Sequence, residues 1–305
     1  MEDGKERETS LFLSFVFWYN LSGGYMLLVE NFDDYKIINT SMGDNLEKWG
    51  YYYVLRPDPE IIWKEDMDKS LVHAYYHRSN KGGGYWETLK SLPSSWVINY
   101  KDLKFNVKLM GFKHTGVFPE QSINWDYMRE RLKTRKGAKV LNLFAYTGCA
   151  SVACLKEGAS VVHVDSSRGM VDWAKENVKL NGLDDKPIRY LVDDVKKFVD
   201  REIRRENKYD AIVMDPPSFG RGSNNEVWDI EKDLYDLVLK CKEILVDNPL
   251  FFIINSYTAG LSPVVLENIV KKIFDLGNID IGELGIKTET GMVLPCGVFL
   301  RYEKN

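Results

Sequence analysis

The chain has 305 residues, of which 44% are hydrophobic and 28% charged, a composition typical of a globular protein with one large or two modest domains. A net charge of −4 and an isoelectric point near 5.7 exclude a protein coated in positive charge for binding nucleic acid, although a local basic face stays open. The four cysteines form no CxxC pair and have no zinc-like spacing with the four histidines. We therefore expect reduced cysteines, no metal site and a cytoplasmic location. No pattern indicates an oligomeric state.

An apolar stretch over residues 11–29 is about as long as a membrane span. Polar and glycine residues between positions 20 and 24 interrupt it, and acidic residues outnumber basic ones ahead of it, unlike in a signal peptide. The pattern favours an N-terminal extension over residues 1–25 and no membrane contact.

Residues 26–110 consist of short β-type runs separated by turn residues. Tyr51–Leu55 and Trp96–Tyr100 are two such runs, and aromatic residues are dense throughout. The triple glycine at 82–84 predicts a hairpin turn and not a phosphate-binding loop, because no helical pattern follows it. We predict a small antiparallel β domain.

Residues 123–135 have the three- and four-residue spacing of a helix. Between Lys101 and Lys139 there are ten Lys or Arg and four Asp or Glu. This local excess of positive charge is typical of a solvated helix face. The alternative is a strip that contacts nucleic acid.

After Gly137 strands and helices alternate, which predicts a Rossmann-like, mostly parallel sheet with helices on both faces in a domain over residues 111–305. The last two strands follow one another without a helix, so we expect one of them to be antiparallel. The predicted strands are 139–144, 160–165, 188–192, 211–214, 250–255, 281–287 and 292–302, and the predicted helices are 150–157, 169–181, 196–206, 234–246 and 263–276.

Ligands of such sheets bind beyond the carboxyl ends of the strands. The first loop there, residues 142–150, has a single glycine, which disfavours a pyrophosphate cradle but suits the amino-acid end of S-adenosylmethionine. Asp165, at the tip of the second strand, suits the two hydroxyls of a ribose, with a helix N-cap as the alternative. Asp193 and Asp194 follow the third strand, where one acid can face an adenine amino group and the other can cap a helix.

The most specific motif is Asp215-Pro216-Pro217-Ser218-Phe219, directly after the fourth strand. Two prolines there keep the chain from entering a helix. The neighbouring acid and aromatic ring can hold and stack a planar base or amine. We predict that Asp215, Pro216 and Phe219 form the catalytic pocket.

From about Gly111 to Gly260 the chain resembles the class I methyltransferases related to bacterial 23S ribosomal RNA cytosine-5 methyltransferases. FKHTGVFPEQ, LNLFAYTG, HVDSS, DDV and DPPSFGRG carry the resemblance. It implies a seven-stranded sheet with the last strand reversed, S-adenosylmethionine as cofactor and RNA as partner. The cofactor-binding residues that it implies are Gln121, Phe144, Tyr146, Thr147, Gly148, Asp165, Ser166, Asp194 and Asp215.

The chain departs from that family in its cysteines. Cytosine-5 methylation needs a thiolate that adds to the ring. In the family this cysteine follows the fifth strand, where residues 254–258 contain Ser256 and no cysteine, and Ser218 stands where some related enzymes have another. The N-terminal region also lacks resemblance to the family's RNA-binding module.

We therefore expect a methyltransferase that acts on an RNA base, with ribosomal RNA favoured and the acceptor atom open. The alternatives are a protein or small-molecule methyltransferase, and a non-catalytic RNA-binding protein that keeps the fold.

Overall fold

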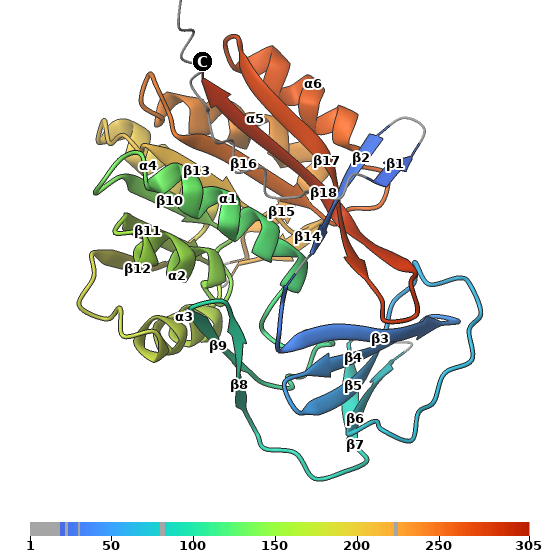
Figure 1. The fold of residues 1–305 in the computed structure, drawn as a ribbon. Helices are drawn as coiled ribbons and strands as arrows, with labels where there is room; N and C mark the ends of the chain where they lie inside the picture. Colours follow the sequence, from blue (N-terminus) through green and yellow to red (C-terminus); the bar gives the residue numbers. More distant parts are fainter. Residues whose placement is uncertain (1–18, 22–23, 30, 80–82, 223–224, 305) are drawn as a thin grey trace, which may run out of the picture.

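The computed structural model describes residues 19–304 except 22–23, 30, 80–82 and 223–224. A large sheet carries helices on both faces, and a smaller β unit formed by β3–β7 lies below one end of it (Figure 1). None of the helices in these ranges is long and apolar enough to cross a membrane. Most of the expected extension over residues 1–25 lies outside the described residues.

The centre of the large sheet is the predicted parallel array. In it β10 pairs in parallel with β11 and β13, β11 with β12, and β13 with β16. The last strand, β18, is antiparallel to both β16 and β17, which confirms the reversed strand. The bounds are β10 Lys139–Leu143, β11 Ser160–Asp165, β12 Ile188–Val192, β13 Ala211–Met214, β16 Phe251–Ser256, β17 Gly277–Lys287 and β18 Val293–Lys304.

Two further strands extend this sheet beyond the seven that the resemblance implies. β2 (Gly24–Val29) pairs in parallel with β17, and β1 (Tyr19–Leu21) pairs with β2. Leu27 packs with Leu284 and Phe299, so the end of the apolar stretch, Gly24–Val29, is a strand of the main sheet. β2 thus crosses the boundary expected at residue 26. The division into residues 1–25, 26–110 and 111–305 stays a prediction.

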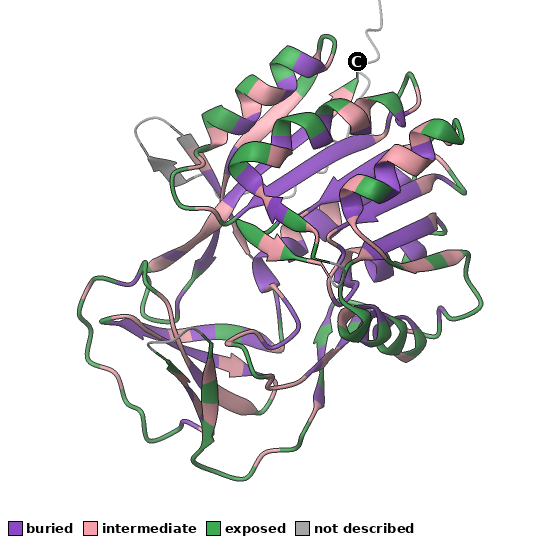
Figure 2. Ribbon diagram, turned by 180° about the vertical axis from the view of Figure 1, so that it is seen from behind, coloured by how far each residue is buried: buried purple, intermediate pink, exposed green. Residues whose placement is uncertain are grey.

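The helices divide evenly between the two faces of the sheet. Alternate strand residues point to opposite faces, so Val140 packs in the cluster with α1–α3 and Leu141 in the cluster with α4–α6. The central strands are buried and the outer helix faces are exposed (Figure 2). The bounds are α1 Ser122–Leu132, α2 Cys149–Lys156, α3 Arg168–Leu180, α4 Val195–Arg204, α5 Ile230–Glu243 and α6 Pro263–Ile273, with a short 3-10 helix, η1, at Pro119–Gln121.

The predicted β region at the N-terminal end contains a five-stranded sheet in the order β3-β4-β5-β6-β7. Its pairs are antiparallel except β5 with β6, which is parallel. The glycine run joins β6 to β7, as a hairpin turn should, although Gly82 itself lies outside the described residues. The bounds are β3 Tyr35–Ser41, β4 Asp44–Trp49, β5 Tyr52–Pro57, β6 Ala74–Arg78 and β7 Gly84–Thr88.

A hairpin of β8 (Trp96–Tyr100) and β9 (Leu103–Val107) connects this sheet to the larger one. The backbone N–H of Asn106 donates to Oδ1 of Asn177 on α3 at 2.8 Å. One buried apolar cluster runs without a break from Trp49 in β4 to Val140 in β10. The two sheets therefore share a core.

Candidate functional site

A cavity of about 580 Å³ lies beyond the carboxyl ends of β10, β11 and β13. This volume is in the range of small-molecule sites. One wall comes from the large sheet and the other from the N-terminal β unit. The residues of the first wall include Phe144, Tyr146, Asp165, Ser166, Asp194, Asp215, Pro216 and Trp228, and those of the second include Tyr35, Asn45, Glu47, Arg56 and Asp58. Lys113 and His114, in the segment after β9, also line the cavity.

The loop after β10 has a constrained backbone. Phe144 and Tyr146 have φ of 54° and 50°, and Gly148 has φ of 80°. Non-glycine residues in the left-handed region are uncommon and are often found at functional sites. A Cβ on Gly148 would lie 2.8 Å from the Cβ of Ala174 in α3, so only glycine fits between the loop and that helix.

Asp165 holds this loop to the tip of β11. Its Oδ2 accepts the N–H of Tyr146 and its Oδ1 accepts the N–H of Ser167, each at 2.8 Å. Burial raises the pKa of the Asp165 carboxyl above its ordinary value. Each oxygen keeps a further lone pair. The carboxylate is therefore fixed in place and can still accept two hydroxyls from the cavity.

The two acids after β12 have different partners. Asp194 lines the cavity and also caps α4, since its Oδ1 accepts the N–H of Lys197 at 2.9 Å. Asp193 is not among the cavity-lining residues and forms an ion pair with Arg201. Of the two, Asp194 can therefore face a cofactor.

A second, smaller cavity of about 60 Å³ adjoins the first and shares Phe144, Tyr146 and Asp215 with it. The remaining predicted cofactor residues, Gln121, Thr147 and Gly148, line only this smaller cavity. All the predicted cofactor residues thus lie around one continuous region.

The proline motif brings Asp215 and Pro216 to the cavity, but not Phe219. Phe219 begins β14 (Phe219–Arg221), which pairs with β15 (Val227–Asp229), and it is 55% exposed and absent from the cavity lining. Trp228 of β15 lines the cavity instead. Its ring lies 4.8 Å from that of Phe144, and its indole N–H donates to the carbonyl of Pro217 at 2.6 Å. This short hairpin has no signal in the sequence pattern.

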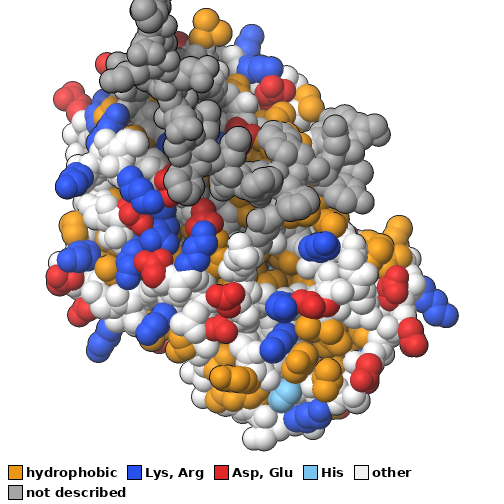
Figure 3. Space-filling model, viewed as in Figure 1, with side chains coloured by type: hydrophobic (Ala, Val, Ile, Leu, Met, Phe, Trp, Pro, Cys, Tyr) orange, Lys and Arg blue, Asp and Glu red, His pale blue; other side chains and the backbone are white. Residues whose placement is uncertain are grey.

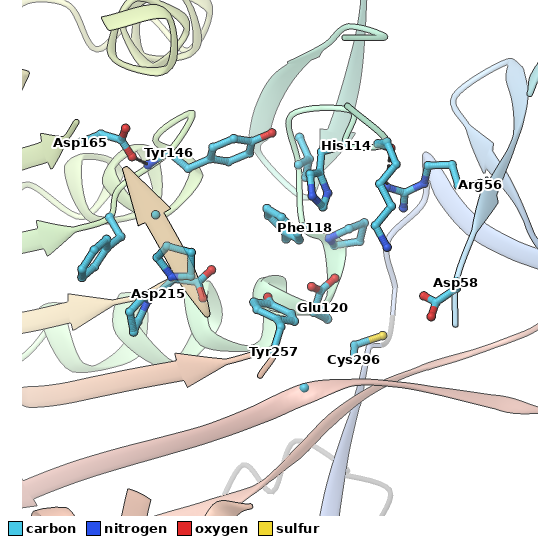
Figure 4. A pocket seen from close by; sticks show the side chains of 18 of the residues that line it. Arg56, Asp58, His114, Phe118, Glu120, Tyr146, Asp165, Asp215, Tyr257 and Cys296 are labelled. Atoms are coloured by element: carbon cyan, nitrogen blue, oxygen red, sulfur yellow. Dashed lines mark hydrogen bonds between the residues drawn. The ribbon is translucent and has the colours of Figure 1, made fainter. Parts of the chain in front are cut away.

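Two carboxyl groups and a tyrosine meet in the middle of the cavity (Figure 4). Burial, with the charge of Glu120 as a second cause, raises the pKa of Asp215 to about 8. Burial also raises the pKa of Glu120 to about 7. The hydroxyl of neighbouring Tyr257 acts in the opposite direction and lowers the pKa of Glu120. No sequence pattern singles out Glu120 or Tyr257 as site residues, although Glu120 lies in the FPEQ segment that carries part of the resemblance.

The wall from the N-terminal β unit contains a fixed guanidinium group. Arg56 of β5 donates to both carboxylate oxygens of Glu47 in β4, at 2.5 and 2.6 Å. The hydroxyl of Tyr35 donates to the same carboxylate at 2.7 Å. The Arg56 guanidinium also lies 5.6 Å from the ring centre of Trp49. No sequence pattern indicates this wall, because its residues come from three strands with no local motif.

Neither cysteine that lines the two cavities is available as a thiolate. Burial raises the pKa of Cys149 to about 12, and burial with nearby carboxylates raises that of Cys296 well above its ordinary value. Cys296 is partly buried. Ser256, at the family's cysteine position, is buried and accepts the N–H of Thr258 at 3.2 Å. The site therefore has no nucleophile for the cytosine-5 route.

The only histidine in the cavity lining, among the described residues, is His114. Burial, assisted by the positive charges of Arg56 and Lys113, lowers its pKa to about 4. His114 is therefore neutral near pH 7. Elsewhere in the described ranges, no group of three or more His, Cys, Asp or Glu side chains is arranged to hold a metal ion.

The basic strip of α1 is largely neutralised by acidic partners. Arg129 pairs with Asp102 at 2.7 Å and with Glu157 at 2.6 Å, and Arg135 pairs with Asp210 at 2.7 Å. Figure 3 shows basic and acidic side chains interspersed on this face. The structure favours the solvated helix face over a nucleic-acid strip.

Known proteins that are similar to this chain are methyltransferases, as expected from the cavity at the strand ends of the sheet. Residues 59–280, well over half of the chain, match a family described as S-adenosylmethionine-dependent methyltransferase. The ribosomal RNA large subunit methyltransferase K/L of Pseudoalteromonas atlantica is 34% identical over 177 residues, which is 57% of this chain and 24% of that protein. The ribosomal RNA large subunit methyltransferase K of Neisseria meningitidis is 26% identical over 250 residues, 77% of this chain and 68% of that protein. This chain spans about a quarter of the length of the K/L relatives.

Solved structures of methyltransferases are also similar to this chain. A SAM-dependent methyltransferase from Agrobacterium tumefaciens is 33% identical, with a TM-score of 0.88 and coverage of 92% of this chain and 93% of that one. A methyltransferase complexed with SAH, 20% identical, has a TM-score of 0.71 over 90% of this chain and 76% of its own, which shows a shared fold. The more specific resemblance to cytosine-5 enzymes is not confirmed by these relatives.

Proposed function

Because the chain belongs to the S-adenosylmethionine-dependent methyltransferase family, we propose that it transfers the methyl group of S-adenosylmethionine to a base of RNA, with ribosomal RNA as the favoured substrate. One observation carries the proposal. Asp165, which suits a ribose, and Asp215 of the Asp-Pro-Pro motif line a single cavity. This cavity is large enough for a nucleoside and a second planar group.

The residues at the Asp165 end fit the cofactor. The fixed carboxylate of Asp165 has spare lone pairs for two ribose hydroxyls, and Asp194 can accept from the adenine amino group. The rings of Phe144 and Trp228 supply an apolar surface for the base. The smaller cavity beside Gly148 and Gln121 can take the amino-acid end. When bound, the cofactor supplies an electrophilic methyl group on a positively charged sulfur.

The chain's own contribution is alignment of the acceptor. Asp215 is held at the end of β13 by the two prolines that follow it, so that its carboxyl group can accept a hydrogen bond from the acceptor. Alignment of two reacting groups can account for much of a rate enhancement, and a partly enclosed cavity also excludes water.

The acceptor atom that this site favours is nitrogen. Methylation of cytosine carbon requires a thiolate, whereas a nucleophilic nitrogen requires none. Both cavity cysteines have raised pKa values, and Ser256 replaces the family's cysteine.

RNA is favoured over a protein or a small molecule for two reasons. The relatives are named as ribosomal RNA methyltransferases. Exposed aromatic side chains also lie on and beside the N-terminal β unit, where Tyr85 stacks on His77 at 5.1 Å, and Phe112, whose carbonyl accepts the indole N–H of Trp86, is 65% exposed. Figure 3 shows hydrophobic side chains at the surface of this unit. Such rings can stack on unpaired bases. The intact Asp165 and Asp215 disfavour a non-catalytic RNA-binding protein.

The test uses purified protein, S-adenosylmethionine with a labelled methyl group, and ribosomal RNA from a strain that lacks the protein. We expect label to enter the RNA, and we expect Asp215→Ala to reduce transfer by about 100-fold or more while cofactor affinity stays within about threefold. Equal loss of transfer and of cofactor affinity in this variant would refute the pocket assignment. Absence of cofactor binding by the wild type in calorimetry, up to millimolar concentration, would reject the proposed function.

A further inference from the structure

Behind the cavity a chain of hydrogen bonds runs in one direction. Nε of Arg301 donates to Oδ1 of Asn124 at 2.9 Å, and Nδ2 of Asn124 donates to Oε1 of Gln121 at 3.0 Å. Nε2 of Gln121 then donates to the hydroxyl oxygen of Tyr257 at 2.7 Å. Arginine is only a donor, so the buried Arg301 fixes which way each amide points.

The chain ends beside Glu120. Because the Tyr257 oxygen already accepts from Gln121, its own proton can be donated elsewhere, and the Glu120 carboxyl lies next to it (Figure 4). Glu120 is 5% exposed and lines the cavity. It takes part in none of the ion pairs found among the described residues. Figure 4 shows Glu120 beside Tyr257, with Asp215 on the other side of the tyrosine ring in this view.

A buried carboxylate without a cation is costly unless hydrogen-bond donors satisfy it. Tyr257 lies beside Glu120 as a possible donor, and Asp215 has no hydrogen bond to a described residue that relieves its burial. The two groups offer acceptors to anything in the middle of the cavity, where a ligand that brings two N–H donors would relieve both. A primary amine on a planar ring has this pair of donors.

Resting on the proposed function, we propose that Glu120 and Asp215 form a paired-carboxylate subsite that binds the two N–H groups of an exocyclic amine of an RNA base, and that this amine nitrogen receives the methyl group. Glu120 is then a second catalytic residue, and Tyr257, Gln121 and Asn124 are positioning residues. Adenine, cytosine and guanine carry such an amine, and uracil does not.

The two acids can accept the proton that the methyl transfer leaves in excess. The amine nitrogen forms a bond to the methyl carbon with its lone pair, while the carbon–sulfur bond breaks and leaves its electron pair on sulfur. The nitrogen then has one proton in excess. Asp215 or Glu120 accepts that proton and releases it to water, so that the positive charge of the cofactor leaves the site as a proton.

The first test compares two buried glutamates that each lie next to a tyrosine hydroxyl. Glu120→Gln keeps the size of the side chain and removes the charge. We expect it to lower kcat/KM for methylation of the undermethylated ribosomal RNA by about tenfold or more, with cofactor affinity within about threefold of wild type. Glu202, which is 1% exposed in α4 and accepts the Tyr209 hydroxyl at 2.7 Å, is outside the cavity lining. Glu202→Gln should stay within about twofold of wild type.

The second test uses the pH profile of kcat/KM. In Tyr257→Phe the loss of the hydroxyl raises the pKa of Glu120, so the acid limb of the profile should move to higher pH. In Glu120→Gln the loss of charge lowers the pKa of Asp215, so the acid limb should move to lower pH. A merely structural role would not move the limb in opposite directions. The charged or titratable groups that act on this pair are Arg56, Glu47, Tyr257 and Cys296.

The product gives the decisive readout. Mass spectrometry of the methylated RNA should place the new methyl group on the exocyclic amine of a nucleoside. A methyl group on uridine, or a folded Glu120→Gln variant that methylates at the wild-type rate, would overturn the subsite. A wild-type protein that binds the cofactor and methylates no RNA would instead reject the proposed function, and the subsite with it.

Discussion

Asp165 connects two loops that would otherwise be free to separate, because it accepts one backbone N–H from the loop after β10 and one from its own loop. Substitution by alanine removes these two bonds and the carboxylate that we assign to the ribose. We predict that Asp165→Ala weakens cofactor binding by about 10- to 100-fold in calorimetry, as expected for hydrogen bonds to a charged group.

Asp193 provides the control, since it is one of the acids after β12 but pairs with Arg201 outside the cavity lining. Asp193→Ala should leave cofactor affinity within about twofold of wild type. Equal weakening by the two substitutions would mean that Asp165 acts through general stability and not through contact with the cofactor.

Asp215 gives a prediction about stability and pH. Its pKa is about 8 in the folded protein and near 4 in an unfolded chain, so the folded state holds the proton more tightly. The free energy of unfolding should therefore fall as pH rises from about 4 to about 8. An amide at this position does not titrate, so Asp215→Asn should be more stable than wild type at pH 8 by of order 1 kcal/mol, with a smaller gain at pH 5. Urea denaturation at the two pH values measures this, and a gain independent of pH would contradict it.

Individual site residues could be predicted from the sequence where they directly follow a buried strand. Asp165 and Asp215 follow buried strands whose carboxyl ends meet at one edge, and both line the cavity. Glu47 and Tyr257 could not be predicted in this way, because each contributes through tertiary contacts with residues that are distant in the sequence. Phe219 was expected in the pocket, but the short hairpin that it begins leaves it exposed outside the lining.

Among the elements, strands β4 and β5 are joined by the buried pair of Glu47 and Arg56. Removal of one partner leaves the other charge buried and unpaired, which costs more than the pair itself contributes. We predict that Glu47→Gln lowers the free energy of unfolding by about 3 kcal/mol. Asp44→Asn, on the same strand, removes the charge that pairs with the exposed Lys69 and keeps an oxygen for the Tyr75 hydroxyl, so it should cost about 1 kcal/mol or less. Similar losses for the two variants in urea denaturation would refute the assigned role of the pair.

The alternating elements of the large sheet were predictable because each is long and apolar enough to show its period. The strand predicted at residues 211–214 coincides with β13, and the helix predicted at 169–181 differs from α3 by one residue at each end. The pairing of β2 with β17 was not predictable, since it joins segments about 250 residues apart. The parallel pairing of β5 with β6 was missed for a related reason, because strand direction leaves no local pattern.

At the scale of the whole molecule, the N-terminal β unit and the large sheet share a buried core and form opposite walls of one cavity. The cofactor end is built by the large sheet, and the far end is built by β3–β5. The N-terminal β unit therefore helps to form the site in addition to any contact that it makes with RNA.

The central claim is methylation of an RNA base at the Asp215 end of this cavity. Its most direct test is mass spectrometry of the nucleosides of ribosomal RNA from a strain that lacks the protein, from its parent, and from the strain restored with wild-type or Asp215→Ala protein. The account predicts that one methylated nucleoside is lost without the protein, returns with the wild type and does not return with Asp215→Ala. Identical methylated nucleosides in all four strains would contradict it.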